Sequence, residues 1–161
     1  MLDDVLNWGL TIKEALVVLR RKIETNPENV PPKLASLPGF ATKAEALDYL
    51  NRAMKEAEDY LIVALWARFE TILLKESVPP PVRRKRKRLL KCMKAGSVTP
   101  QAREDYPEMS PEMYKKVVKV YKYRSWVAHG KRRPRPAVCS ASEAYRLLTK
   151  VLDIVLQEER K

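Results

Sequence analysis

The sequence predicts an all-α protein: a bundle of four to five helices, up-down in arrangement, with a long second helix. Three observations favour this fold class. Apolar residues recur three and four positions apart, Ser/Thr-x-x-Glu sequences precede several of these runs, and no segment alternates apolar and polar residues as a half-buried strand does. With 161 residues, the chain is long enough to bury a core and is most simply a single domain, residues 1–161.

Two helices are expected in the first half of the chain, separated by a break at 27–39. The capping box Thr11-Ile12-Lys13-Glu14 predicts a helix over residues 11–25. The capping box Thr42-Lys43-Ala44-Glu45 predicts a long helix over residues 43–76. Apolar residues follow one side of each helix: Ile12, Leu16, Leu19 and Ile23 in the first, and Leu47, Leu50, Leu61 and Leu65 in the second.

Three further helices follow, with breaks expected at 79–81, 97–107 and 132–136. Val82, Leu89 and Met93 keep a helical seam through a very basic segment that ends near Gly96. Ser110-Pro111, a cap followed by proline at the first helical position, begins a helix that runs to about His129 and stops at Gly130. The capping box Ser140-Ala141-Ser142-Glu143 begins the last helix, residues 141–159, whose wide apolar side predicts deep burial.

The charge balance indicates a polyanionic partner. Lys plus Arg number 32 against 20 Asp plus Glu, which gives a net charge of +12. Nucleic acid is the commonest polyanion that such a surface attracts. A basic but inert surface, or one that binds anionic lipid, stays open as an alternative.

Composition also disfavours several kinds of site. One His and two scattered Cys residues, Cys92 and Cys139, cannot build a His/Cys zinc site within one chain, and four isolated glycines allow no phosphate-binding loop. Glu56, Glu58 and Asp59 are expected on the polar, solvated side of the long helix. We therefore expect no metal and no cofactor. The acidic N-terminus is unlike a signal peptide and the longest apolar run is too short to span a bilayer, so we expect a cytoplasmic protein with no membrane partner.

One arginine lies where an apolar residue is expected. The helix over 111–129 has an apolar stripe, and its members are Met113, Val117, Val120 and Val127. Arg124 completes the series. A buried cation is costly without a partner, so Arg124 either pairs with an internal carboxylate, for which Glu70 is a candidate, or extends its charge to the edge of the stripe, or has a functional role.

The only histidine, His129, lies at the end of the same helix. The negative end of the helix dipole favours its imidazolium form, which suits either a helix cap or an acid–base group. Five positions along a regular helix correspond to about 500°, so the side chains of Arg124 and His129 point about 140° apart. They converge if the helix end distorts, or if a second copy of the chain brings its own pair alongside.

The segment Tyr123-Arg124-Ser125-Trp126-Val127-Ala128-His129-Gly130 resembles the Arg-x4-6-His signature of the HEPN superfamily, small all-helical proteins of which many are metal-independent RNA endonucleases. Residues 60–70, ending in Phe69-Glu70, are similar to the long second helix of several HEPN families, and the likeness covers about residues 42–159. Two positions depart from the pattern. Ser125 stands where Asn or Asp often follows the arginine, and Lys131 stands where members regulated by a nucleotidyltransferase antitoxin have tyrosine.

The resemblance implies a homodimer that cleaves RNA in a cleft shared by the Arg and His residues of both subunits. A ribose 2′-OH attacks the adjacent phosphate to give a 2′,3′-cyclic phosphate and a free 5′-OH. In this expectation His129 transfers the proton, Arg124 holds the phosphate, and Ser125 and Glu70 support them. The implied setting is a toxin or an antiviral nuclease, with an antitoxin or a regulatory protein as a further partner. The alternative is a non-catalytic HEPN module that binds RNA or a protein partner through its basic face.

Two basic segments are expected to bind RNA phosphates. The first contributes Arg83, Arg84, Lys85 and Arg86, and the second, directly after His129, contributes Lys131, Arg132, Arg133 and Arg135. For both, a solvated face without a ligand stays open. Tyr121, Tyr123 and Trp126 are candidates to stack on exposed bases, although core packing suits Trp126 better.

Overall fold

The structure, a computed structural model, describes residues 2–26, 42–75, 77–131, 134–137 and 139–160. In this part of the chain there are helices only: α1 (Asp3–Thr25), α3 (Lys43–Leu73), α4 (Pro80–Ala95), α5 (Pro100–Asp105), α6 (Pro111–Ala128) and α7 (Ala141–Glu158). The described residues form no strand, so the prediction of an all-α protein is confirmed. The break predicted at 27–39 lies outside the described residues.

Most helix ends lie where capping chemistry predicts them. The capping boxes of Thr42 and Ser140 are both formed, with side chain and backbone bonding reciprocally. The Ser110 side chain accepts from the backbone N–H of Met113, and Pro111 occupies the first turn of α6. Helix α4 ends at Gly96, whose backbone N–H donates to the carbonyl oxygen of Cys92 in the preceding turn. Gly96 has a φ of +74°, the left-handed conformation that glycine adopts readily.

Two of the predicted boundaries are wrong. The first helix begins at Asp3 and not at residue 11, because Thr11 lies in mid-helix and its hydroxyl donates to the carbonyl oxygen of Asn7 at 2.9 Å instead of capping. The predicted break at 97–107 contains the short helix α5. There Thr99 accepts from the backbone N–H of Ala102 at 3.2 Å and Pro100 fills the first helical position.

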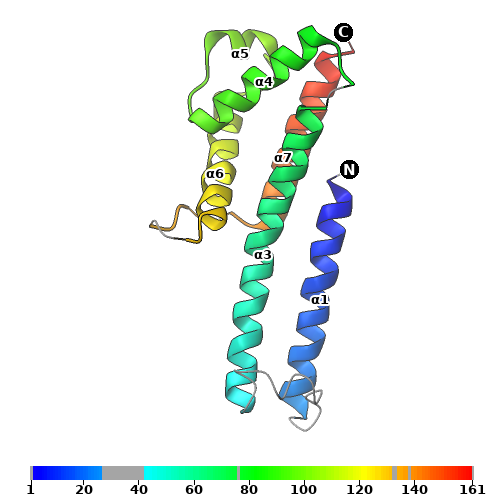
Figure 1. Cartoon of the computed structure of the whole chain (residues 1–161), viewed down its shortest axis with the longest axis vertical. Helices are drawn as coiled ribbons and strands as arrows, with labels where there is room; N and C mark the ends of the chain where they lie inside the picture. The colour runs from blue at the N-terminus through cyan, green and yellow to red at the C-terminus, as the bar shows by residue number, and fades with distance from the viewer. Residues whose placement is uncertain (1, 27–41, 76, 132–133, 138, 161) are drawn as a thin grey trace.

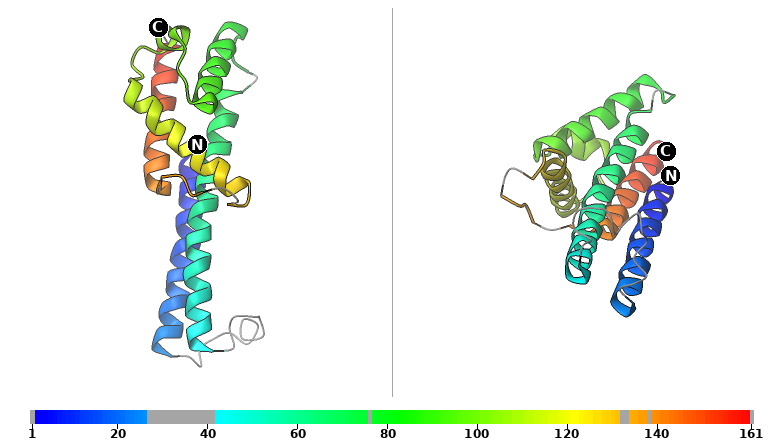
Figure 2. Two further views of the ribbon diagram at one scale, coloured as in Figure 1. Left: turned by 90° about the vertical axis from the view of Figure 1, so that its left-hand side faces the viewer. Right: turned by 60° about the horizontal axis from the view of Figure 1, so that its bottom comes forward.

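The helices form a body and a stalk (Figure 1). The stalk consists of α1 and the N-terminal half of α3, which run antiparallel. The body consists of the C-terminal half of α3 together with α4, α5, α6 and α7, and both views of Figure 2 show the stalk extending beyond it. Gly9 permits close packing of α1 on α3, because a Cβ atom there would lie 2.5 Å from the side chain of Leu61.

The body holds the larger hydrophobic core. Within it, the buried Trp66 ring lies 5.4 Å from the Phe69 ring and 5.2 Å from the ring of the partly buried Tyr121, measured between centroids, in the tilted arrangement that aromatic pairs favour. The stalk has a small core of its own, in which Ile23 and Leu50 are buried. Helix α6 packs against α3, α4 and α7, so one side of it is fixed by the core while its outer side faces solvent.

Candidate active site

Helix α6 ends in a tight backbone turn that presents His129 on the surface. His129 is the C-cap residue, and its backbone N–H donates to the carbonyl oxygen of Ser125 at 3.0 Å. The backbone N–H groups of Gly130 and Lys131 donate to carbonyl oxygens of the preceding turn at 3.0 and 2.9 Å, the two bonds of a Schellman motif. Gly130 has a φ of +70°, which reverses the chain directly after the histidine.

Lys131 continues this turn in an uncommon conformation. Its φ of +61° lies in the left-handed region, which residues other than glycine rarely occupy. Lys131 Nζ forms an ion pair with Asp59 Oδ2 at 2.8 Å and lies 5.8 Å from the centroid of the Trp126 ring. The Asp59 carboxylate raises the pKa of Lys131. These contacts hold the segment after α6 against α3.

Asp59 is a buried carboxylate at the centre of a polar cluster. It is 3% exposed and accepts a hydrogen bond from the Tyr123 hydroxyl at 2.6 Å. Arg135 Nη2 donates to the same hydroxyl oxygen at 3.0 Å. Burial, reinforced by the Asp59 carboxylate, raises the pKa of Tyr123, so the phenol remains protonated and able to donate. We call Asp59, Tyr123, Lys131 and Arg135 the Asp59 cluster.

This cluster corrects two expectations. Asp59 is not on a solvated face, because the partners on α6 and after it bury it. Tyr123 is 1% exposed, so it is not available to stack on a base. Tyr121 packs on Trp66 in the core. Trp126 is half-buried and faces the hollow described next.

A hollow of about 570 Å³ adjoins the end of α6, and we call it the His129 hollow. Its lining residues are Tyr121, Lys122, Ser125, Trp126, His129, Pro134 and Pro136. Ser125 and His129 share a face because four positions correspond to about one helical turn. His129 is exposed, and no described residue forms a hydrogen bond with its imidazole ring. The hollow therefore combines an acid–base group, a hydroxyl, a cation and an aromatic edge.

Arg124 lies outside this hollow. Its side chain is half-buried, and its Nε atom is buried with no hydrogen-bond partner among the described residues. The predicted partner, Glu70, instead binds Lys94 Nζ at 2.6 Å. The Arg124–Glu70 ion pair, one of the alternatives considered for Arg124, is therefore not formed. Within one chain the structure brings Ser125 and His129 together and leaves Arg124 and Glu70 elsewhere.

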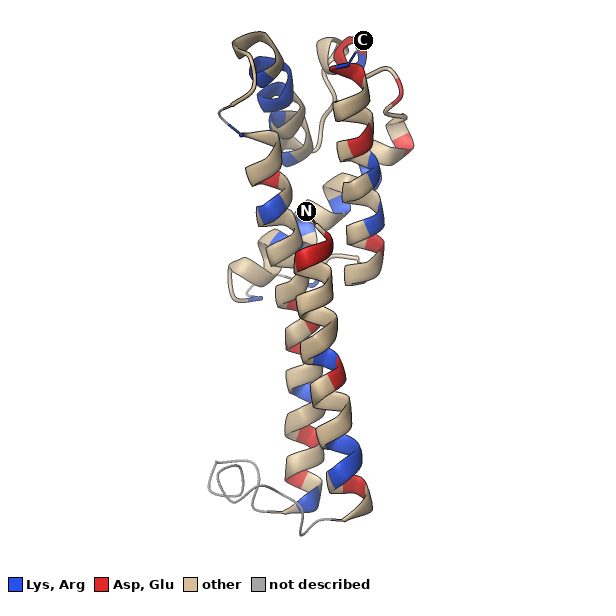
Figure 3. Ribbon diagram, turned by 90° about the vertical axis from the view of Figure 1, so that its right-hand side faces the viewer, with Lys and Arg blue, Asp and Glu red and all other residues tan. Residues whose placement is uncertain are grey.

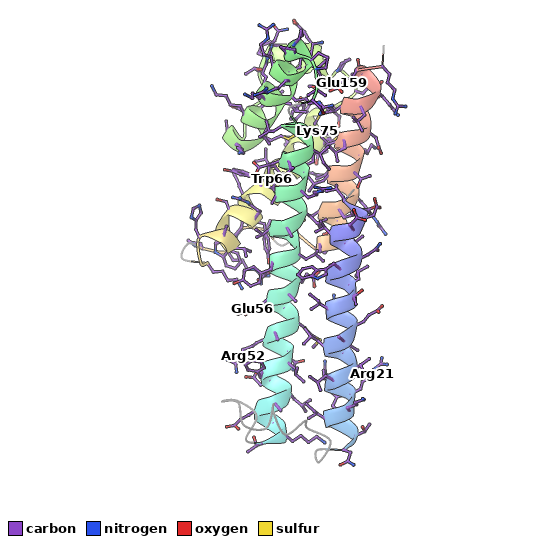
Figure 4. The ribbon with its side chains drawn as sticks, turned by 45° about the vertical axis from the view of Figure 1, so that its right-hand side comes forward. Arg21, Arg52, Glu56, Trp66, Lys75 and Glu159 are labelled. Atoms are coloured by element: carbon purple, nitrogen blue, oxygen red, sulfur yellow. The ribbon has the colours of Figure 1, made fainter. Side chains whose placement is uncertain are left out.

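The basic segment of α4 divides into buried and exposed residues. Arg86 is 3% exposed, and its guanidinium binds both carboxylate oxygens of Glu159 at 2.6 and 2.5 Å and the carbonyl oxygen of Ile72 at 3.0 Å. Glu159 lies at the upper end of α7 in Figure 4, beside the end of α3. Arg86 thus joins three helices. Its burial argues against the predicted contact with RNA, because three of its N–H groups already bind oxygens of the protein.

The other basic residues differ in whether they already interact with carboxylates of the protein. Lys85 lies 4.0 Å and Arg88 lies 3.4 Å from carboxylate oxygens of the buried Asp105, whereas Arg84 is exposed. Figure 3 shows the block of Lys and Arg that α4 contributes to the body, in contrast to the mixed charges of the stalk. Lys131 and Arg135 belong to the Asp59 cluster. Arg132 and Arg133 lie outside the described residues.

The remaining groups that could support catalysis or bind a metal ion give weaker candidates for a site than the His129 hollow. Burial, with a contribution from Glu143, raises the pKa of the Cys139 thiol to about 11, so at neutral pH it is a thiol and not a nucleophilic thiolate. Across the described ranges, no group of three or more His, Cys, Asp and Glu side chains is placed to hold a metal ion. None of the described helices combines the length and apolarity needed to cross a bilayer.

Comparison with known proteins assigns no family. The chain matches no protein-family model, and it matches neither a curated protein nor a solved structure. A role for the His129 hollow is therefore inferred from its own residues and their chemistry.

Proposed function

We propose that the protein is an RNA endonuclease whose active site is built around the His129 hollow. The observation that carries this proposal is the presence of His129, Ser125 and Lys122 in one hollow of about 570 Å³, a volume within the range of small-ligand sites. An imidazole can transfer protons near neutral pH, and a neighbouring cation attracts phosphate. The net charge of +12 favours a polyanionic substrate.

The reaction we propose needs only the RNA chain itself. The ribose 2′-oxygen attacks the adjacent phosphorus and loses its proton to a base. The bond from phosphorus to the 5′-oxygen breaks, and this oxygen takes up a proton, giving a 2′,3′-cyclic phosphate and a 5′-OH. His129 handles a proton in this step, a contribution of about 10²–10⁴-fold in general acid–base catalysis. Ser125 and Lys122 hold the phosphate.

A second subunit supplies what one chain lacks in this proposal. One histidine cannot be both base and acid in the same instant, and Arg124 lies outside its own chain's hollow. A homodimer that pairs the α6 ends of two subunits provides two histidines and two arginines. Arg124 favours this arrangement, because its side chain is only half-buried and no carboxylate of the described residues forms an ion pair with it, which leaves its guanidinium able to bind a phosphate. Glu70, bound to Lys94, is left out of the chemistry.

The second candidate is a non-catalytic module that binds RNA or a protein partner through its basic face. The separation of Arg124 from His129 within one chain favours it, because binding does not require these groups to converge. Under the first candidate, the biological setting implied by the HEPN resemblance is a toxin or an antiviral nuclease held by an antitoxin or a regulatory protein.

Two single substitutions test the assignment of the site. His129→Ala and Arg124→Ala should each reduce RNA cleavage by about 10²-fold or more, while circular dichroism and size-exclusion chromatography remain as in the wild type. Glu112→Ala, at an exposed position in the first turn of α6, is the matched control and should keep full activity. Unchanged cleavage by the His129→Ala protein would remove this residue from the mechanism. Loss of fold in the Arg124→Ala protein would make that arginine structural.

A further inference from the structure

The outer face of α6 carries a stripe of lysines that the proposed mechanism does not use in full. Lys115, Lys119 and Lys122 are spaced four and three positions apart, so they lie on one face of the helix. All three side chains are exposed, and none forms an ion pair with a carboxylate of the described residues. The same spacing continues to Trp126 and His129. At 1.5 Å per residue the stripe leads about 21 Å along α6 to the histidine.

Three hollows adjoin this stripe and share its lysines. A hollow of about 420 Å³ is lined by Lys115, Lys119 and Lys122 together with Arg103, and by the apolar residues Val98 and Val118. Lys122 also lines the His129 hollow. Lys119 also lines a hollow of about 470 Å³ between α6 and α7, where Lys116, Arg146 and Lys150 add three more cations beside one carboxylate, Glu143. The stripe and its hollows therefore form one continuous basic surface, which we call the α6 track.

The α6 track lies open to a large ligand. In the left-hand view of Figure 2, α6 crosses the body obliquely on the side that faces the viewer, and no other helix lies in front of it. The basic residues of α4 differ, because Glu159 and Asp105 neutralise several of them. Free cations concentrated on one uncovered helix attract a ligand with regularly repeated negative charges.

We propose that a single strand of RNA binds along the α6 track, and this inference rests on the proposed function. Its phosphates lie on Lys115, Lys119 and Lys122, a base enters the hollow lined by Val98 and Val118, and the strand continues into the His129 hollow. A base can enter such a hollow only if it is unpaired, which selects a single strand over a duplex. The track thereby defines the substrate class as unpaired RNA and positions the bond to be cleaved.

The residues of α6 argue against an anionic membrane as the ligand of this surface. A helix that binds in a membrane interface needs exposed apolar side chains beside its cations. In α6 the apolar residues Val117, Val120 and Val127 are buried in the body. The face that remains is a row of cations that ends at an acid–base group, as a nuclease needs and a membrane anchor does not.

The test compares two variants that remove equal charge. Lys115→Gln, Lys119→Gln and Lys122→Gln are combined in the track variant. Arg21→Gln, Lys22→Gln and Lys55→Gln, all at exposed positions of the stalk, are combined in the control variant (Figure 4 shows Arg21). The probe is a labelled oligouridylate of about 12 nucleotides, within the site sizes of single-strand binders. Its 2′-oxygens are methylated, so that binding is measured without cleavage.

The track variant should bind this probe about tenfold or more weakly, and the slope of log affinity against log salt should flatten by about 2, which is about 0.7 for each of three phosphates. The control variant should bind like the wild type. A third variant, with arginine at the three track positions, keeps the charge and should keep the binding. An unmethylated probe measures cleavage in parallel.

Each of the other outcomes would refute a defined part of the proposal. If the track and control variants weaken equally, only overall charge matters and the track is refuted. If the wild type cleaves RNA and the track variant binds and cleaves as well as it does, the track and the proposed phosphate contact of Lys122 fail, while cleavage at His129 stands. If the wild type neither binds nor cleaves RNA, both fail. If the track variant instead loses binding to phosphatidylserine vesicles while RNA binding is unchanged, the surface belongs to a membrane ligand.

Discussion

At the scale of single residues, polar groups on buried faces determine how the candidate site is built. Asp59 lies on the same side of α3 as Ile62, Trp66 and Phe69, at spacings of three, four and three, and all four are buried. Arg86 likewise fits the seam of Val82, Leu89 and Met93 in α4. The criterion that singled out Arg124 from the sequence, a charge within an apolar stripe, therefore applies to these two residues as well.

The sequence predicts such a position but not its partner. The position of Arg124 in an apolar stripe favours an internal partner, and Glu70 is a candidate because it lies near aromatic residues on the long helix. In the structure Glu70 instead forms an ion pair with Lys94 of α4. The partner of a buried charge depends on which helices cross and at which residues they cross. The spacing of apolar residues along the sequence carries no such information.

Asp59→Asn should destabilise the protein through the Asp59 cluster. The amide keeps the size of the side chain but leaves Lys131 without its counter-ion, and it weakens the bond from the Tyr123 hydroxyl. We expect the free energy of unfolding to fall by about 1–3 kcal/mol, the cost of disrupting a buried hydrogen bond to a charged group. Urea unfolding measures it.

The matched control for this change is Glu56→Gln, on the same helix and exposed. It should alter the free energy of unfolding by no more than about 0.5 kcal/mol. If the two variants unfold at the same urea concentration, the Asp59 cluster contributes nothing to stability.

At the scale of helices, capping chemistry was the most informative part of the sequence. The ends at Thr42, Ser110 and Ser140 are each fixed by a local bond between side chain and backbone, so a few neighbouring residues suffice to predict them. Thr99-Pro100 has the same character as Ser110-Pro111 and is the signal by which α5 could have been found. The helix start predicted at Thr11 is wrong because the pattern Thr-x-x-Glu also occurs inside helices, where the threonine hydroxyl donates to a carbonyl oxygen of the preceding turn.

Helix α4 provides a test that separates structural from ligand-binding cations. Arg86→Gln leaves the carboxylate of Glu159 without its guanidinium partner. Loss of one partner of a buried ion pair costs about 3–5 kcal/mol, and we expect a value near the lower limit because Glu159 is partly exposed. Chemical denaturation gives this value.

Arg84→Gln, two positions away and exposed, is the control and should change the free energy of unfolding by less than about 0.5 kcal/mol. RNA affinity, measured under conditions where both variants are folded, should not fall more for Arg86→Gln than for Arg84→Gln. A larger loss of affinity in the Arg86→Gln protein, with stability unchanged, would restore Arg86 to the RNA-binding surface.

At the scale of the whole molecule, the fold class was accessible from the sequence and the spatial division was not. Helical periodicity and the absence of alternating patterns indicated an all-α chain with a long second helix, as the structure confirms. Helix α1 pairs with only half of α3, so a stalk extends beyond the body (Figure 1). This division depends on where the helices pack and not on the spacing of apolar residues along the sequence. The lysines of α6 give no signal in the sequence for a related reason: they are dispersed along the chain and gather only on one face of the helix.

The proposed dimer predicts a particular response to mixing subunits. Wild-type and His129→Ala proteins are exchanged at different ratios, and cleavage is measured after exchange is complete. If both histidines of a shared cleft are needed, only wild-type dimers act, and activity should fall as the square of the wild-type fraction. A linear fall, with mixed dimers confirmed by mass spectrometry, would show independent sites. A protein that is a monomer while it cleaves RNA would exclude the shared cleft.

The central claim, that this protein cleaves RNA at the His129 hollow by 2′-OH attack, is tested most directly by the ends of the fragments. Purified protein is incubated with RNA in the presence of EDTA, and the ends are identified chemically, with the His129→Ala protein as the control. We predict fragments that carry 2′,3′-cyclic phosphate and 5′-OH ends, formed in EDTA by the wild type and not by the variant. RNA that is bound but left intact, or fragments with 5′-phosphate ends, would contradict the claim.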